Sequence, residues 1–588
     1  MNGLEWWKRY HGGGYPWIRD DFNHCKNIHL KYASLPEVTL TAFTEAGEPE
    51  SSISVLKQRT YTGKNPVIPS SLADTPCTRL GVEGLLGKLN NMLGTSYTLE
   101  IRSLSSLLEV YIHKNYDFGT VYSNLRQFWH LDLTDIEDKL QTREAWDHQM
   151  RQDVLVNDKI IGPLVPPRRV WDLFSNRVVP WWVTRLVNHS HPWAISHAWM
   201  KEEDRVDVHT PINGCKWPVP MPRDANLDLI RIEMLNEGAE YVWLDVLCLR
   251  QVGGCGENLR AEEWKLDVPT IGCVYSMASD QLVCYLSGLG RPFSLKEDDL
   301  ESDRCWFRRA WTLQETQRHM IIGGDTGDDI FTEKEMRTRV ENRLSLLEQG
   351  VGGAGPGTPV FSALSEMQKR VSTNHVDRVA GLSYLLQTEE IPAYYAAQSE
   401  EEAWNVLVDE MAPPERAHMF FLYPQPGNGS KCWRPSWKQA MTEVLPPPHL
   451  SDLDCGWDGS VQRTKEKNAD WCDGFCITTG YVRGLSQGSL EGNFRQGELV
   501  LEHKTGAKHT FMVVADHQYP IPEGLYALVG SPPFDFLQQV FNKQCWVIEK
   551  RLPRQTFKKV SVFRMPDEEE VKRLHDLNIA TYARTVLA

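Results

Sequence analysis

The sequence predicts a multidomain protein with α/β, α and β regions, in which a central parallel α/β sheet stands between a helical N-terminal region and a β-rich C-terminal region. Three observations lead to this fold class. Apolar residues recur at helical spacing from Gly84 to Trp129. Short apolar runs alternate with amphipathic stretches between residues 168 and 324, as in a parallel α/β sheet. Strand-like runs dominate after residue 446, and a length of 588 residues accommodates about three or four domains.

We expect four segments, divided where the composition changes. Pro163, Pro166 and Pro167 end the first helical pattern, and the glycine-rich run Gly350–Gly357 indicates a loop. In order, the segments are a mostly helical N-terminal region, the α/β domain, a helical region with the glycine-rich loop, and a β-rich domain with a terminal helix: residues 1–165, 166–325, 326–445 and 446–588.

The elements of the α/β domain follow from apolar runs and helical periodicity. Tyr241–Leu249 is almost continuously apolar, as expected for a strand covered on both faces. A helix over Leu227–Leu235 should stop near Gly238, and a helix over Glu262–Ser279 should kink or split at Pro269. The remaining expected elements are three strands and one helix: Trp193–His197, Gln281–Ser287, Met320–Gly323 and the helix Arg304–Arg318.

The C-terminal segment is expected to hold strands followed by one polar helix. The runs alternate apolar and polar residues or are rich in β-branched residues. The strands are Phe475–Val482, Glu498–Glu502, His509–Ala515, Gly524–Gly530, Cys545–Lys550 and Lys559–Arg564, and the helix is Asp567–Thr585.

Composition argues against several classes of protein. The net charge is −15, from 63 Lys and Arg against 78 Asp and Glu, which disfavours a dedicated nucleic-acid binder. No apolar run approaches the ~18 residues that span a bilayer, and the first residues lack the apolar core of a secretory signal. The 13 cysteines are scattered and odd in number, so full internal pairing is excluded. We therefore expect a soluble, cytoplasmic protein without a membrane span.

Common catalytic and metal-binding motifs are missing. The sequence contains no P-loop, no HExxH and no GxSxG motif. Cys472 and Cys476 lack a second ligand pair, and His189 with His191 lacks a third ligand. We expect no metal and no bound cofactor.

Four blocks of the α/β segment resemble the fungal heterokaryon-incompatibility (HET) domain family. They are Ala194-Ile-Ser-His-Ala-Trp199, the run Tyr241–Gln251, Glu263-Trp264 leading to Val274-Tyr-Ser-Met-Ala278, and Arg309-Ala-Trp-Thr-Leu-Gln-Glu315. The segment Asp377-Arg-Val-Ala-Gly-Leu is similar to a motif that commonly follows this domain. The resemblance covers residues 168–390.

The chain departs from the family pattern at three positions. Asp267 stands where glutamate is usual, Met200 replaces a customary glycine, and Pro269 interrupts the helix. The resemblance implies a protein of fungal self/non-self recognition and programmed cell death. It implies as partners a second copy of the chain and other incompatibility proteins.

A more distant likeness is to TIR domains, which have a strand ending in Ile-Ser-His and later a Trp-x-x-x-Glu helix. This chain has Ile195-Ser-His197, then Leu286-Ser287, then Trp311-x-x-x-Glu315. Some TIR domains cleave NAD at the nicotinamide–ribose bond with that glutamate, so the resemblance implies a TIR-like sheet, a catalytic role for Glu315 and NAD as substrate.

The chemistry needs few groups. Nicotinamide leaves as a neutral molecule, so no acid has to protonate it, unlike the leaving group of an ordinary glycoside. One fixed carboxylate in a dry cleft can stabilise the ribosyl cation that develops. Glu315 is the catalytic candidate, and the substrate-binding candidates are Ser196, His197, Trp199, Asp245, Gln251 and Trp311.

Each candidate also has a structural interpretation. Trp311 can be a core anchor, and Glu315 can pair with Arg308 or Arg318. Ser196 and His197 can cap a helix, since they end a strand, although ligands also bind at that edge of α/β sheets. Asp245 can be a buried hydrogen-bond acceptor. The alternative function is therefore a non-catalytic death-signalling module that recruits partners.

Overall fold

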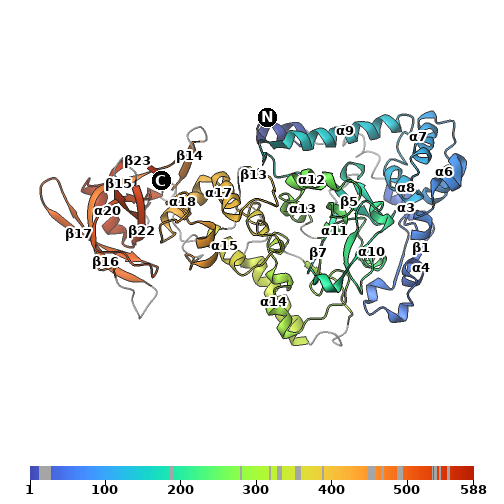
Figure 1. The fold of residues 1–588 in the computed structure, drawn as a ribbon. Helices are drawn as coiled ribbons and strands as arrows, with labels where there is room; N and C mark the ends of the chain where they lie inside the picture. Colours follow the sequence, from blue (N-terminus) through green and yellow to red (C-terminus); the bar gives the residue numbers. More distant parts are fainter. Residues whose placement is uncertain are drawn as a thin grey trace. The chain divides into compact units, whose positions relative to one another are not determined.

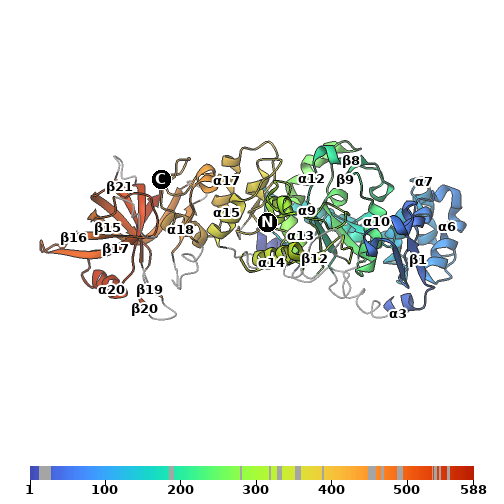
Figure 2. The same ribbon diagram turned by 90° about the horizontal axis from the view of Figure 1, so that it is seen from below.

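The computed structural model describes the chain except for residues 12–27, 185–190, 279–280, 317–319, 328–333, 351–358, 387, 389, 448–458, 465–468, 487–493, 533, 536–539, 542–543, 552–556 and 588. The chain divides into two compact units, Met1–Gly355 with Glu390–Ala396, and Pro356–Glu389 with Ala397–Ala588 (Figure 1, Figure 2). The predicted fold class is confirmed: a helical N-terminal region, a central parallel sheet with an antiparallel edge, and an antiparallel C-terminal sheet. The three predicted boundaries between the four segments stay predictions.

The N-terminal region is helical after a short hairpin. The hairpin pairs β1 (Val38–Thr41) with β2 (Thr60–Gly63), and short α-helices lie before and between them: α1 (Gly3–Tyr10), α3 (Ile28–Ala33) and α4 (Ala42–Ala46). Apolar residues at helical spacing then bury one shared core, which includes Leu85, Leu108 and Trp129. The helices around it are α5 (Ser70–Ala73), α6 (Cys77–Leu93), α7 (Arg102–His113), α8 (Phe118–Arg126) and α9 (Ile136–Val154).

The central sheet has six strands in the order β12-β11-β7-β10-β5-β6. Its parallel strands are β7 (Trp193–His197), β10 (Tyr241–Leu244), β11 (Leu282–Tyr285) and β12 (Met320–Ile322). An antiparallel hairpin of β5 (Arg169–Asp172) and β6 (Arg177–Pro180) extends the edge beside β10. Helices α10 (Leu227–Asn236), α12 (Arg260–Asp267) and α13 (Ile271–Met277) connect the parallel strands (Figure 1).

Two of the predicted elements in this domain are wrong. The strand expected over Tyr241–Leu249 ends at Leu244, because Asp245 begins a short helix, α11 (Asp245–Cys248), and accepts a hydrogen bond from its own neighbour, Val246 N, at 2.7 Å. The helix expected over Arg304–Arg318 is two 3₁₀ turns instead, η8 (Trp306–Arg308) and η9 (Trp311–Leu313).

The second of these corrections has a local cause. The Thr312 hydroxyl donates to the carbonyls of Trp306 at 2.7 Å and Arg309 at 2.8 Å, and such side-chain bonds compete with helical ones. By contrast, the expected break at Pro269 is confirmed, since α12 ends at Asp267 and α13 starts at Ile271.

Further helices follow the central sheet. α14 (Lys334–Gly350) belongs to the first unit. α15 (Val360–Gln368), α16 (Asp377–Ala380), α17 (Glu400–Glu410), α18 (Pro413–Phe421) and α19 (Trp437–Thr442) belong to the second.

The C-terminal sheet of the second unit closes on itself. Its ladder runs β14-β15-β16-β17-β22-β21-β18, and β18 pairs again with β15. All six predicted strands are present. The bounds are β14 (Val461–Thr464), β15 (Ala469–Arg483), β16 (Arg495–Glu502), β17 (Lys508–Ala515), β18 (Gly524–Gly530), β21 (Gln544–Arg551) and β22 (Phe557–Met565).

The predicted terminal helix is too long. α20 (Glu568–Asp576) ends before Asn578, which has a φ of 50°, and the chain continues as β23 (Thr581–Leu587) paired with β15. Residues 581–587 contain three β-branched residues and an aromatic one, so strand pairing prevails over the polar helical pattern.

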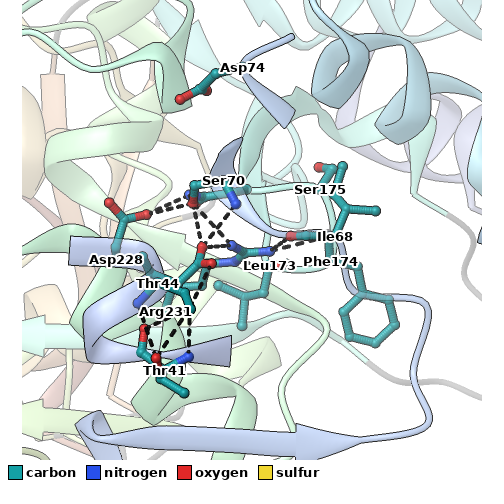
Figure 3. Close-up of polar contacts among 12 residues, drawn as sticks. Thr41, Thr44, Ile68, Ser70, Asp74, Leu173, Phe174, Ser175, Asp228 and Arg231 are labelled. Carbon is teal, nitrogen blue, oxygen red and sulfur yellow. Dashed lines mark hydrogen bonds and ion pairs between the residues drawn. The ribbon is translucent and has the colours of Figure 1, made fainter. Parts of the chain in front are cut away.

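A buried arginine ties the N-terminal region to the central sheet (Figure 3). Arg231 of α10 donates from Nε to Leu173 O and from Nη2 to Ile68 O, each at 2.7 Å. Its Nη1 pairs with Glu45 of α4 at 3.1 Å, and both side chains are fully buried. The Ser70 hydroxyl, at the start of α5, donates to the same Glu45 carboxylate at 2.6 Å. A fully buried ion pair is stable in this form because its partners satisfy the remaining donors and acceptors.

We predict that Arg231→Met destabilises the first unit by about 3–5 kcal/mol, because it leaves the Glu45 carboxylate buried without a cation. Urea unfolding followed by tryptophan fluorescence measures this. The matched control is Arg223→Met, since Arg223 is exposed and donates to Glu203 O. Equal losses in both variants would contradict the assignment.

Candidate active site at the carboxyl edge of the parallel sheet

The site lies where β7 ends. β7 is the first parallel strand in the chain, and its sheet neighbours are the second, β10, and the third, β11. The connections therefore leave β7 on opposite sides, which creates the topological switch point at which α/β sheets bind ligands. Ser196 and His197 are the last residues of β7, Asp245 follows β10 directly, and Glu315 precedes β12. The structure thus brings together the three candidates at strand ends and Glu315.

The Ser196 hydroxyl is the centre of the first group of contacts. It donates to Glu315 Oε2 and accepts from Trp306 Nε1 at 2.6 Å. Ser196 and Trp306 are fully buried, and Glu315 is 8% exposed. In the sheet, Ser196 pairs with Cys284 of β11, so the serine lies at the switch point between β7 and β11. The hydroxyl and the indole fix the orientation of the carboxylate.

The Glu315 carboxyl has an unusual protonation equilibrium. Burial raises its pKa to about 7, against the opposing effect of the Ser196 hydrogen bond. The Asp245 charge raises the pKa further, whereas His197 and Arg309 lower it. A carboxyl that changes charge near neutral pH is suited to acid–base or electrostatic work, and such groups concentrate at functional sites.

His197 and Asp245 form a second pair. His197 Nε2 lies 2.9 Å from Asp245 Oδ1, and the imidazole ring lies 5.5 Å from the Trp199 ring. Burial works to lower the pKa of His197, but the Asp245 carboxylate outweighs it, and the pKa is raised. Successive strand residues point to opposite faces, so this pair and the Ser196–Glu315 pair flank the end of β7. The Arg205 guanidinium lies over the Trp199 ring, 5.3 Å from its centroid.

The remaining sequence candidates have different surroundings. Gln251 is half-buried, and its amide donates to Leu249 O at 2.9 Å, so it holds the loop after α11. Trp311 is half-buried in η9, and the expected helical face shared with Glu315 does not exist, since no α-helix spans the two. Arg308 pairs with Asp303 at 3.1 Å, while Arg318 lies outside the described residues.

Sequence reasoning missed three residues around the Ser196–Glu315 pair. Trp306 is one of them. The sequence offered only a general indication of its role, because a buried indole N–H needs a hydrogen-bond acceptor. Tyr275 belongs to the block Val274–Ala278, and its hydroxyl donates to Ile195 O at 3.1 Å. Burial and, after it, the charge of Glu315 raise the pKa of Tyr275. Cys284 is fully buried. Burial raises the pKa of its thiol, and the charge of Glu315 raises it further.

The described residues contain no group of three or more His, Cys, Asp and Glu side chains that could hold a metal ion. His189 lies outside the described residues. Across the same part of the chain, no helix is both long and apolar enough to cross a membrane.

Comparison of the chain with protein-family models, with curated proteins and with solved structures finds no match.

We predict that the free energy of unfolding of Glu315→Gln increases relative to that of the wild type as pH rises from 5 to 8. The raised pKa means that Glu315 contributes stability below pH 4.5, and that this contribution is lost as pH rises through about 7. A shift from 4.5 to about 7 corresponds to about 3 kcal/mol at about 1.4 kcal/mol per unit. Glutamine does not ionise, so the variant lacks this loss. Melting temperatures across the pH range test it, and parallel curves for the two proteins would contradict it.

A further prediction concerns the second pair. Asp245→Asn removes the charge that raises the pKa of His197, so that pKa should fall. Proton NMR titration of the imidazole measures the shift. Asp224→Asn serves as the control, because Asp224 is an exposed partner of Arg291. An unchanged His197 titration in the Asp245 variant would show that the pair does not interact.

Proposed function

We propose that the chain is a heterokaryon-incompatibility-type protein of fungal self/non-self recognition and programmed cell death, and that it hydrolyses NAD at the nicotinamide–ribose bond. The single observation that supports the reaction most strongly is the buried Glu315 carboxyl at the switch point of the parallel sheet. The four motif blocks support the family, and the described sheet supports the α/β part of the TIR likeness.

The reaction consumes NAD⁺ and water and yields ADP-ribose, nicotinamide and a proton. The N-glycosidic electron pair leaves with nicotinamide, which neutralises the pyridinium. Positive charge then develops at the ribose, and the ionised Glu315 carboxylate stabilises it in a site of low dielectric. A water oxygen forms the new bond to the ribose carbon, and its proton passes to the site or to solvent.

The contacts suggest separate roles for the other residues. Ser196 uses its only proton on Glu315, so we assign it to positioning rather than to substrate binding. Trp306 donates to the same serine and is fully buried, so we assign it to positioning as well. Asp245 and Trp199 are half-buried, and His197 is buried beside them. We assign this less buried side of the site to contact with the nucleotide.

The second candidate is a non-catalytic death-signalling module, and one observation favours it. Ser196 is fully buried and Glu315 nearly so, which suits a structural carboxyl. In that case the Ser196–Glu315 contact holds the loop before β12 to the sheet, and the chain acts by recruiting partners. Incubating the purified protein with NAD and measuring nicotinamide separates the two functions.

We extend the proposal to assembly and location. A cytoplasmic protein that acts with a second copy of itself or with other incompatibility proteins fits the family resemblance. Light scattering combined with the nicotinamide assay tests the self-association, and a monomer that turns over NAD would exclude it.

We predict that Glu315→Gln lowers NAD cleavage by about 10²-fold or more, the scale associated with losing one electrostatic group. Glutamine retains the acceptor for Ser196 but not the charge. The control is Glu301→Gln, because Glu301 is 69% exposed and pairs only loosely with Arg308 at 3.8 Å. Nicotinamide release and melting temperature are measured on the same preparations, and full turnover by a folded Glu315 variant would end the catalytic assignment.

A further inference from the structure

Two cysteines of the first unit differ from the others in their exposure. Among the cysteines that the structure describes, Cys215 and Cys255 are exposed, and the rest are buried or half-buried. Cys215 follows the 3₁₀ turn η5 (Pro211–Asn213), and Cys255 lies in the loop between α11 and α12. The chain between the two cysteines forms β9 (Val219–Pro222), α10, β10 and α11. The function proposed above uses neither thiol.

The loops that carry these cysteines touch each other through their backbones. A Cβ atom at Gly254 would lie 1.9 Å from Lys216 O and 2.5 Å from Trp217 Cα, so no residue with a side chain fits there. A Cβ atom at the preceding residue, Gly253, would contact Pro218 Cγ at 3.4 Å. The glycine at position 254 therefore permits a close approach of the two backbones, which is a common role of this residue.

The order of these contacts gives the direction in which the two loops run. As the second loop advances from residue 253 to residue 254, its contacts on the first loop move back from residue 218 to residues 217 and 216. The two segments are therefore antiparallel. Continued by one residue, this register brings Cys255 opposite Cys215. Opposed Cα atoms of antiparallel backbones in a sheet lie about 4.5–5.5 Å apart, and a disulfide spans about 4.4–6.8 Å between its Cα atoms.

Side chains hold both loops in this arrangement. The Arg250 guanidinium lies 5.2 Å from the ring centroid of Trp217 in the first loop, and its Nη1 donates to Cys255 O in the second loop at 3.1 Å. Trp217 is fully buried, and its Nε1 donates to Val246 O of α11 at 3.1 Å. The Asn213 amide donates to Trp217 O at 2.8 Å. The loops are thus fixed before any bond joins them, which matters because a disulfide tolerates little distortion.

We propose that Cys215 and Cys255 are a redox-sensitive pair, which a hydroperoxide converts into a reversible disulfide that clamps the two loops together. The exposure of both residues gives the oxidant access to the thiols. A disulfide in a reducing compartment is usually transient and redox-sensing, which fits the cytoplasmic location proposed above. The inference does not rest on NAD cleavage.

The reaction consumes two thiols and one hydrogen peroxide molecule and yields one disulfide and two water molecules. The thiolate of one cysteine attacks a peroxide oxygen, the O–O bond breaks, one oxygen leaves as water, and the sulfur becomes a sulfenic acid. The second thiolate attacks that sulfur, so that the S–S bond forms, the S–O bond breaks and the second water leaves. The two sulfurs lose two electrons, which the peroxide takes up. A dithiol reductant restores both thiols by thiol–disulfide exchange.

The test is peptide mapping of the full chain, which is reduced, freed of reductant and treated with hydrogen peroxide at micromolar protein concentration. The remaining thiols are alkylated, and a tryptic digest is analysed by mass spectrometry without reduction. The wild type should give a cross-linked peptide pair that contains Cys215 and Cys255, and dithiothreitol should remove it. Cys215→Ser and Cys255→Ser should each abolish the pair. The matched control, Cys432→Ser, changes a half-buried cysteine of the second unit and should keep it.

The melting temperature tests the clamp itself. The disulfide would close a covalent loop that contains α10, β10 and α11, and such a cross-link reduces the entropy of the unfolded chain. The oxidised wild type and the oxidised Cys432→Ser protein should therefore melt at a higher temperature than their reduced forms. Cys255→Ser should show no such difference.

Each outcome decides the proposal. A reducible link between Cys215 and Cys255 that raises the melting temperature supports it. Three results would overturn it: no link after peroxide treatment, a link from either residue to another cysteine or to a second copy of the chain, or an unchanged melting temperature in the cross-linked protein. These results stand whatever the NAD assay gives.

Discussion

Burial of the Glu315 carboxyl against the Ser196 hydroxyl is the constraint on which the candidate site depends. The contact joins the end of the first parallel strand to the segment that leads into the last one. Moving the carboxyl into water would release the serine and the Trp306 indole as well, since each satisfies the next. The same burial keeps the acid near its point of half-ionisation at neutral pH.

Helix α10 connects the sheet edge at the candidate site to the N-terminal helices. Two of its buried ionisable side chains, Arg231 and Glu233, bind different neighbours. Arg231 holds the N-terminal helices through Glu45, whereas Glu233 accepts from Tyr285 OH at 2.8 Å and from Gly324 N at 2.8 Å. Tyr285 ends β11, and Gly324 follows β12. The helical N-terminal region and the edge of the sheet that forms the site are therefore connected through one helix.

The sequence predicts much of this fold because local patterns and burial agree there. The parallel strands are recognisable as short apolar runs, and polar residues at their ends must meet at one edge. Ser196, His197 and Asp245 could be predicted for that reason, whereas Glu315 was named only from the Trp-x-x-x-Glu likeness, in a helix that does not form. The predictions that were wrong or missing concern features set by contacts between residues distant in sequence or by side-chain hydrogen bonds. Trp306 reaches a serine 110 residues away, and Thr312 replaces the expected helix with turns. The last strand forms because β15, more than 100 residues earlier, offers an edge.

The most direct test of the central claim is the pH profile of nicotinamide release from NAD by the wild type and by Ser196→Ala. If ionised Glu315 acts on NAD, the rate rises with pH and has a midpoint near 7. The Ser196 hydrogen bond lowers the pKa of Glu315, so its removal should move the midpoint to higher pH. An absence of turnover at every pH, or the same midpoint in both proteins, would contradict the account.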